Sequence, residues 1–374
     1  MIRFVEGLGP LGWRNWKLFD EGFPGRSERS EATFYSDAQL DGSAVDGLGP
    51  YQVLNALADP RQGVGPRLVL RMQFGVELDP SWETTEESGF HGGDVYEELA
   101  ALVSLALGIR CRSGGQTRIW ADSDPLGHPI EYDHRPPYLP HPGRYGPMLP
   151  RIAGTSTKAA EILPLLQLYR AADSEEAIAL VRASRLYQQA IWIADADPNQ
   201  SWLMLVSALE VAADRLGAAK VSPMDRLREA WSDLADLLEP LADDVADSIA
   251  RLLAPLVKSK RAYLSLIERF APEPPPDRPE EAFQVDWTRL REYADTIYNY
   301  RSRALHAGTP FPGPMCESPL FPHGDVVSEK PFGLGTQINE SMWLPEATPM
   351  LLATFEYVAR ETLHSWWRSL AEPA

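Results

Sequence analysis

The sequence YNYRSRALHAG, residues 298–308, places two arginines and a histidine at the end of a segment with helical periodicity. Residues that recur three or four positions apart define one face of this segment: Leu290, Ala294, Ile297, Arg301 and Leu305. The spacing predicts a helix from about Asp286 to Ala307 that turns this face towards the protein interior. Because Arg301 falls on the same face, it needs an anionic partner.

The end of this helix is predicted by Gly308 and Pro310, since glycine adopts the left-handed cap and proline cannot continue a helix. His306 then lies in the last turn, where a histidine suits the helix dipole and can exchange protons near neutral pH. Ser302, four residues before the histidine, shares its side of the helix. Arg301, five residues before it, points about 140° away.

An earlier segment, LMLVSALEVAA at residues 203–213, also has helical periodicity and contains the pair Leu209-Glu210. Glu210 and Asp214 are four residues apart at the edge of its apolar stripe. Either carboxylate could pair with an arginine, Arg301 included. For Asp214 a solvated acidic edge is the favoured interpretation.

These two segments together resemble the signature of the HEPN superfamily. The shared features are a late helix with an arginine, a polar residue, three others and a histidine, preceded by tyrosines, and an earlier helix with a Leu-Glu pair. The run from Tyr300 to Gly308 is most similar to the branch that contains the ApeA-like domains. The resemblance implies an all-helical module that forms a homodimer and cuts RNA without a metal ion.

The resemblance also implies roles for individual residues. Arg301 would hold the phosphate, His306 would handle the proton of the attacking 2′-hydroxyl, and Ser302 would take the variable polar position. Arg303, Glu210 and Tyr300 would bind RNA or support the site. Some HEPN toxins carry a tyrosine two residues after the histidine that a partner nucleotidylates, and Gly308 stands there in this chain.

Two other interpretations explain the same residues. A non-catalytic module could use the helical bundle to dimerise and the last-turn residues to bind a nucleotide or a partner. Alternatively, the motif is incidental, because basic residues suit any helix C-terminus. In that case the protein is a monomeric helical scaffold in which Arg301 simply pairs with Glu210.

Composition restricts these functions. The chain of 374 residues carries a net charge of −18, so its surface as a whole repels nucleic acid and any RNA contact must be local. One local basic cluster lies at Lys258, Lys260, Arg261 and Arg269, where a solvated helix face is an equal explanation.

The sequence gives no sign of membrane contact or of a cofactor. No apolar run approaches the roughly 20 residues of a membrane helix. Cys111 and Cys316 lack any partner spacing, and no secretory leader is recognisable. No Cys/His zinc spacing, P-loop or dinucleotide fingerprint occurs. We therefore expect a cytoplasmic protein without metal or cofactor.

The predicted fold is α+β, with a mixed α/β domain at residues 1–150 followed by an all-helical HEPN-like bundle at residues 151–374. The first domain rests on strands and one helix, expected at Ala32–Tyr35, Tyr51–Leu57, Leu68–Leu78, Asp94–Leu107 (the helix) and Thr117–Trp120. A crowd of prolines from Pro125 to Pro150 marks the boundary. We expect this domain to sense a ligand or regulatory partner.

The second domain is predicted to consist of successive helices. Their expected positions are Thr155–Ala172, with Pro164 either kinking this helix or ending its first half, Asp173–Asp195, a third from Asp197-Pro198, Ser222–Phe270 with a break near Pro240 and a kink near Pro255, the helix ending at Ala307, and Pro349–Leu370. The long connection at residues 309–344 follows His306 directly, and we expect it to cover the site.

Overall fold

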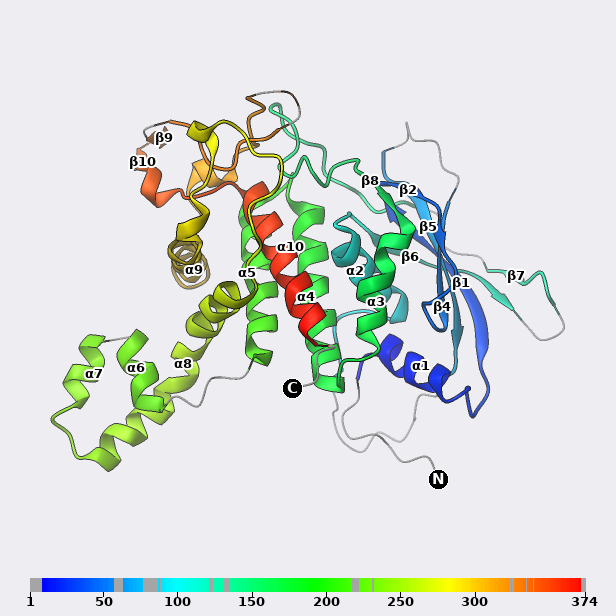
Figure 1. The fold of residues 1–374 in the computed structure, drawn as a ribbon, viewed down its shortest axis with the longest axis horizontal. Coiled ribbons are helices and arrows are strands. Elements are labelled where there is room, and N and C mark those ends of the chain that lie inside the picture. Colours follow the sequence, from blue (N-terminus) through cyan, green and yellow to red (C-terminus); the bar gives the residue numbers. More distant parts are fainter. Residues whose placement is uncertain are drawn as a thin grey trace.

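The computed structural model describes residues 9–370 except 57–62, 77–86, 88, 121–123, 131–134, 217–221, 231, 323, 325, 334 and 339. Within these residues, the protein combines one principal β-sheet with a larger set of helices, as Figure 1 shows. The α+β class predicted from the sequence is therefore confirmed. No helix in the described ranges combines the length and apolar character needed to cross a membrane.

The principal sheet is antiparallel throughout, with strand order β3-β4-β5-β1-β6-β7. Its strands are β1 (Glu28–Ser36), β3 (Ser43–Ala44), β4 (Tyr51–Asn55), β5 (Gly65–Phe74), β6 (Arg112–Trp120) and β7 (His128–Pro129). These strands contain the predicted ones except at two ends. Ala56, Gly75 and Val76 are described but lie outside β4 and β5, and Leu57, Glu77 and Leu78 lie outside the described residues. The two faces of this sheet differ in polarity.

Alternation along β5 separates these faces. Leu68, Leu70 and Met72 are buried, whereas Arg71 between them is exposed. The buried face packs against helix α2 (Val95–Leu107), and Figure 1 shows α2 and α3 on the same side of the sheet. Strand residues with a period of two thus leave the opposite face polar.

Helix α2 begins and ends where the sequence predicts. The Asp94 carboxylate accepts hydrogen bonds from the backbone N–H groups of Tyr96 and Glu97, and Gly108 ends the helix with a φ of 60°. Nearly the whole helix is buried because the sheet lies on one side and the bundle on the other.

The remaining helices form the bundle and its extension. They are α1 (Leu11–Asp20), α3 (Leu163–Tyr169), α4 (Ser174–Ile193), α5 (Pro198–Arg215), α6 (Pro223–Ala230), α7 (Ser232–Leu238), α8 (Asp243–Phe270), α9 (Leu290–Ala307) and α10 (Leu352–Ser369). Asp173 and Glu176 form the predicted capping box at the start of α4, and the predicted Asp197 cap precedes Pro198 in α5.

The predicted helix at residues 155–172 is wrong in its first half. Ser156–Lys158 form strand β8, which pairs in parallel with β2 (Gln39–Asp41), and a 3₁₀ turn leads into α3. Pro164 lies in the first turn of α3, where its missing N–H costs nothing, so it starts a helix instead of kinking one. Pairing with a strand more than a hundred residues away therefore determines the secondary structure of residues 156–158.

Helices α6 and α7 and the first half of α8 extend away from the rest of the molecule in Figure 1. They bury a small core of their own, with Leu227, Leu238, Ala246 and Ala250 at its centre. The predicted break near Pro240 separates α7 from α8. Helix α8 is continuous through Pro255, where a kink was predicted.

A single apolar core crosses the predicted boundary at residue 150. It runs from Trp16 in α1 through α2 and α4 to Trp367 in α10. The sheet and the bundle are therefore packed on each other, and their division into two domains at residue 150 stays a prediction.

The first part of the connection between α9 and α10 is bound to the bundle. The Phe311 ring stacks on Trp202 with centroids 5.3 Å apart, and the Trp202 indole N–H donates to the Met315 carbonyl at 3.2 Å. A short hairpin, β9 (Thr336–Ile338) with β10 (Ser341–Trp343), follows. His306 is exposed, so the connection does not cover it as predicted.

Candidate functional site

The helix with the HEPN-like residues is fixed at both ends by local sequence. The Asp286 carboxylate accepts hydrogen bonds from the N–H and the hydroxyl of Thr288, which caps a 3₁₀ turn at Trp287–Arg289. The α-helix itself therefore starts at Leu290, four residues later than predicted. It ends at Gly308, whose φ of 65° is the left-handed cap predicted for glycine.

Arg301 lies on the inward face of α9 as its spacing predicts, whereas Leu305 at the end of the predicted face is 52% exposed. Nη2 of Arg301 donates to Oε2 of Glu210 in α5 at 2.6 Å. The Arg301 side chain retains 20% of its exposure and the Glu210 side chain 13%. The predicted arginine–carboxylate contact is confirmed, and it joins α9 to α5.

Glu210 is the centre of a small polar cluster. Tyr298, one turn before Arg301, donates its hydroxyl to Oε1 of Glu210 at 3.0 Å. Burial raises the pKa of the Glu210 carboxyl, while Arg301 and the Tyr298 hydroxyl act against this rise. Proton uptake by this carboxyl would release Arg301 from its counter-ion.

Tyr263 of α8 completes the cluster. Its ring lies 5.3 Å from the Tyr298 ring, and burial, followed by the Glu210 charge, raises the pKa of its hydroxyl. Neither this hydroxyl nor Nε of Arg301 has a hydrogen-bond partner among the described residues. The site thus keeps two buried donors that the protein does not use.

The remaining predicted site residues lie elsewhere on α9. His306 and Arg303 are exposed, Ser302 is half-buried, and the Arg303 guanidinium lies 4.5 Å from the centre of the Tyr300 ring. Tyr300 donates its hydroxyl to the Ala347 carbonyl at 2.6 Å, so it anchors the connection before α10.

The structure brings together Glu210 and Arg301 but does not bring His306 to them. Within the described ranges, no hydrogen bond or ion pair joins Arg301 to His306. The reason is the helical geometry, because residues five apart point in different directions. One copy of α9 therefore presents the arginine and the imidazole on different sides.

One residue of the predicted basic cluster near α9, Lys260, is neutralised. Lys260 pairs with Asp295 of α9 at 2.8 Å and also donates to Asn299. Arg269 lies 5.0 Å from the Phe270 ring, and the side chain of Lys258 lies outside the described residues. This cluster supplies less free positive charge than its sequence indicates.

Sequence reasoning missed two tyrosines of the Glu210 cluster. Tyr298 and Arg301 are three residues apart and share a helical face, so helical spacing alone could have identified Tyr298. Tyr263 comes from α8, and only the packing of α8 on α9 places it there.

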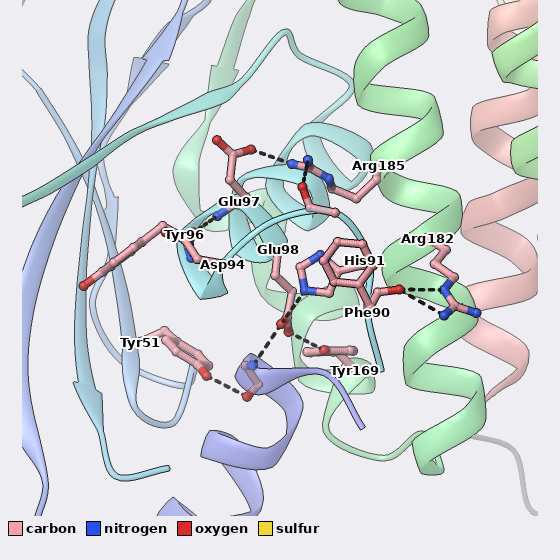
Figure 2. Close-up of polar contacts among 12 residues, drawn as sticks. Tyr51, Phe90, His91, Asp94, Tyr96, Glu97, Glu98, Tyr169, Arg182 and Arg185 are labelled. Atoms are coloured by element: carbon pink, nitrogen blue, oxygen red, sulfur yellow. Dashed lines mark hydrogen bonds and ion pairs between the residues drawn. The ribbon is translucent and has the colours of Figure 1, made fainter. Parts of the chain in front are cut away.

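A second polar cluster, shown in Figure 2, surrounds the fully buried carboxylate of Glu98 in α2. Its oxygens accept hydrogen bonds from the Gly12 N–H at 3.0 Å and the Tyr169 hydroxyl at 2.6 Å. Nε2 of His91 lies 3.5 Å from the same carboxylate. Tyr51 in turn donates to the Gly12 carbonyl.

The Glu98 cluster connects several elements inside the protein. The side chains of Glu98 and His91 are 0% and 4% exposed, which denies a substrate access to them. Figure 2 also shows two arginines of α4. Arg182 donates to the Phe90 carbonyl, and Arg185 donates to the Glu97 carboxylate. These contacts fasten the sheet and α2 to the bundle.

Among the described residues, no group of three or more His, Cys, Asp or Glu side chains is arranged to hold a metal ion. No protein-family model matches the chain, and no curated protein or solved structure shows significant similarity to it. The function must therefore be argued from the residues themselves.

Proposed function

We propose that this protein is a metal-independent endoribonuclease of the HEPN type, which acts as a homodimeric antiphage defence or toxin effector. The observation that carries the proposal is the arrangement at the end of α9. Arg301 is held by Glu210 at 2.6 Å, while His306 is exposed in the last helical turn. A fixed cation and an accessible imidazole meet two needs of such a reaction, charge stabilisation at the phosphate and acceptance of a proton.

The proposed reaction uses the RNA's own 2′-hydroxyl as nucleophile. His306 accepts the hydroxyl proton as O2′ attacks the adjacent phosphorus, and a P–O2′ bond forms. The P–O5′ bond breaks, leaving a 2′,3′-cyclic phosphate and a free 5′-hydroxyl. Arg301 stabilises the negative charge on the phosphate oxygens through its remaining N–H donors.

The departing O5′ needs a proton, and one α9 helix provides one imidazole. A second copy of α9 facing the first would supply a second His306 as the acid. It would also overcome the divergence of Arg301 and His306 on one helix, because the arginine of one protomer could act with the histidine of the other. The proposed homodimer thus follows from the needs of the reaction.

The test compares the full chain with the His306→Ala and Arg301→Ala variants in RNA cleavage with EDTA present, and in growth arrest on expression. Each variant should lose at least about 100-fold in cleavage rate, the usual contribution of a general base for His306 and of a charge-stabilising donor for Arg301. His141→Ala is the matched control, because His141 is also exposed and lies outside α9. Equal cleavage by the intact and His306→Ala proteins would refute the proposed catalysis.

The second candidate is a non-catalytic module that dimerises and binds a nucleotide or a partner. The same ion pair favours it, since Glu210 neutralises Arg301, the arginine on the inward face of α9, in a chain with a net charge of −18. A dimer that binds ligand but never cuts RNA, with or without phage infection, would select this candidate.

A further inference from the structure

A polar groove lies on the face of the sheet opposite to α2. Its volume is about 690 Å³, within the range of about 300–1,000 Å³ that is usual for small-molecule sites. It sits where β1 and β4 begin and β5 and β6 end. The residues used below that line it are Phe19, Arg29, Gln52, Arg71, Gln73 and Trp120.

The strand register places these side chains beside one another. Arg29 of β1 is opposite Gln73 of β5 on one side and Trp120 of β6 on the other. In the neighbouring pair of strands, Gln52 of β4 is opposite Arg71 of β5. Residues opposite each other on one face have side chains within contact range, so the groove floor is one continuous polar surface.

The groove presents an arginine without an ion pair on a strongly acidic protein. Its described lining contains Arg29 and Arg71 together with the carboxylate of Asp124. Arg29 is exposed and makes no ion pair within the described part of the chain. Arg71 uses Nε to bind Glu31 at 2.8 Å and remains about half exposed. Such a groove attracts an anion from solution.

Aromatic rings stand at two sides of the floor. Trp120 lies at the end of β6, and a Cβ added at Gly127 would come within 2.7 Å of its ring, so the following turn packs closely beneath it. Phe19 at the end of α1 is 38% exposed and is held edge-to-face by Phe23. Rings supported in this way are platforms on which a planar ligand can stack.

The two glutamines add directional hydrogen-bonding groups. Nε2 of Gln73 donates to the Ser27 hydroxyl at 2.7 Å, which fixes the amide and leaves its oxygen to accept. Gln52 is half-buried beside Arg71. Amides of this kind bind the donor and acceptor edges of nucleobases.

We propose that this groove binds a mononucleotide, with Arg29 and Arg71 on the phosphate, Trp120 against the base and the two glutamines on the base edge. The site is independent of the proposed ribonuclease site at the end of α9. It gives the sheet a ligand of defined chemistry, and its binding can be measured whether or not the protein cuts RNA.

The experiment is isothermal titration calorimetry of the full chain with AMP, GMP, CMP and UMP, and with adenosine, inorganic phosphate and a short single-stranded oligoribonucleotide. The oligoribonucleotide is titrated into the His306→Ala protein, so that cutting cannot interfere. At least one mononucleotide should bind, and adenosine should bind more weakly because it lacks the phosphate.

Two variants should distinguish the phosphate contact of the site from its base contact. Arg29→Gln should weaken mononucleotide binding by about tenfold or more, the loss expected for one charge-assisted hydrogen bond. It should leave adenosine binding unchanged. Trp120→Leu should weaken both ligands by about tenfold, as for the loss of one base-stacking contact.

Arg144→Gln is the matched control, since it removes the same charge from an exposed position outside the groove. Equal effects of Arg29→Gln and Arg144→Gln would overturn the proposal, as would the failure of all four mononucleotides to bind. An oligoribonucleotide that binds through Arg29 and Trp120 while mononucleotides do not would also overturn it, and would make the groove an RNA contact surface instead.

Discussion

Replacement of Glu210 by alanine provides the sharpest test of the polar cluster at the end of α9. The carboxylate accepts two hydrogen bonds, from Arg301 at 2.6 Å and from the Tyr298 hydroxyl at 3.0 Å. Glu210→Ala leaves an arginine and a hydroxyl without their acceptor. The variant should therefore unfold more easily than the native protein.

The magnitude follows from the two bonds and from solvent access. Both bonds are accepted by a charged carboxylate, and a hydrogen bond to a charged group contributes about 1.5–3 kcal/mol. Arg301 is 20% exposed, so water can solvate part of its charge once Glu210 is removed. We expect Glu210→Ala to lower the free energy of unfolding by about 2–3 kcal/mol. Glu210→Gln keeps an acceptor oxygen and should cost less.

The assay is urea unfolding at pH 7, followed by circular dichroism. Glu175→Ala is a matched control, because Glu175 also binds an arginine of α5, Arg215, at 2.7 Å but is 68% exposed. That exposed pair should contribute no more than about 0.5 kcal/mol. If Glu210→Ala and Glu175→Ala lowered the free energy of unfolding equally, the inferred contribution of the buried cluster would be wrong.

Two further predictions concern buried carboxylates outside the cluster. Glu98→Ala should lower the free energy of unfolding by about 3 kcal/mol in the same assay, because the Gly12 N–H and the Tyr169 hydroxyl lose their acceptor in a fully buried site. Glu98→Gln, which keeps the side-chain volume, should lower it less. Native-like stability of Glu98→Ala would contradict the structural role of the Glu98 cluster. Although burial opposes it, a hydrogen bond with His364 and the charge of Arg360 lower the pKa of Glu361 to about 2 from its ordinary 4.5. A carboxyl with a lowered pKa stabilises the fold above its ordinary pKa, so this contribution should be lost as the pH falls from 4.5 to about 2. The free energy of unfolding of Glu361→Gln should lack this part of the acid dependence. An acid dependence equal to that of the native protein would exclude a contribution from Glu361.

The elements that sequence reasoning placed correctly are those whose signals are local. Alternation along residues 68–72 identifies β5, and the carboxylates of Asp94 and Asp173 identify the starts of α2 and α4. Each signal depends on backbone geometry within a few residues. Residues 156–158 lack such a signal, because their strand exists only through pairing with β2.

The same distinction between local and long-range signals applies to the candidate site. The inward position of Arg301 follows from its spacing, and Glu210 was a predicted partner for it. The tyrosine of α8 at this cluster, the Glu98 cluster and the groove on the sheet all depend on side chains brought together from distant segments. Sequence periodicity assigns each of those residues to a face but carries no information on which faces meet.

Charge links the two proposed sites and limits what each can bind. In a chain with a net charge of −18, an arginine attracts phosphate only where carboxylates do not cancel it. Glu210 offsets Arg301, and Glu31 offsets Arg71 in the groove. Arg29 makes no ion pair in the part of the chain described, which makes the groove able to hold an anion in a single protomer. At the end of α9 each helix carries a single imidazole, so the second histidine that the proposed reaction uses must come from another protomer. The proposed ribonuclease site therefore requires a dimer, whereas the proposed nucleotide site does not.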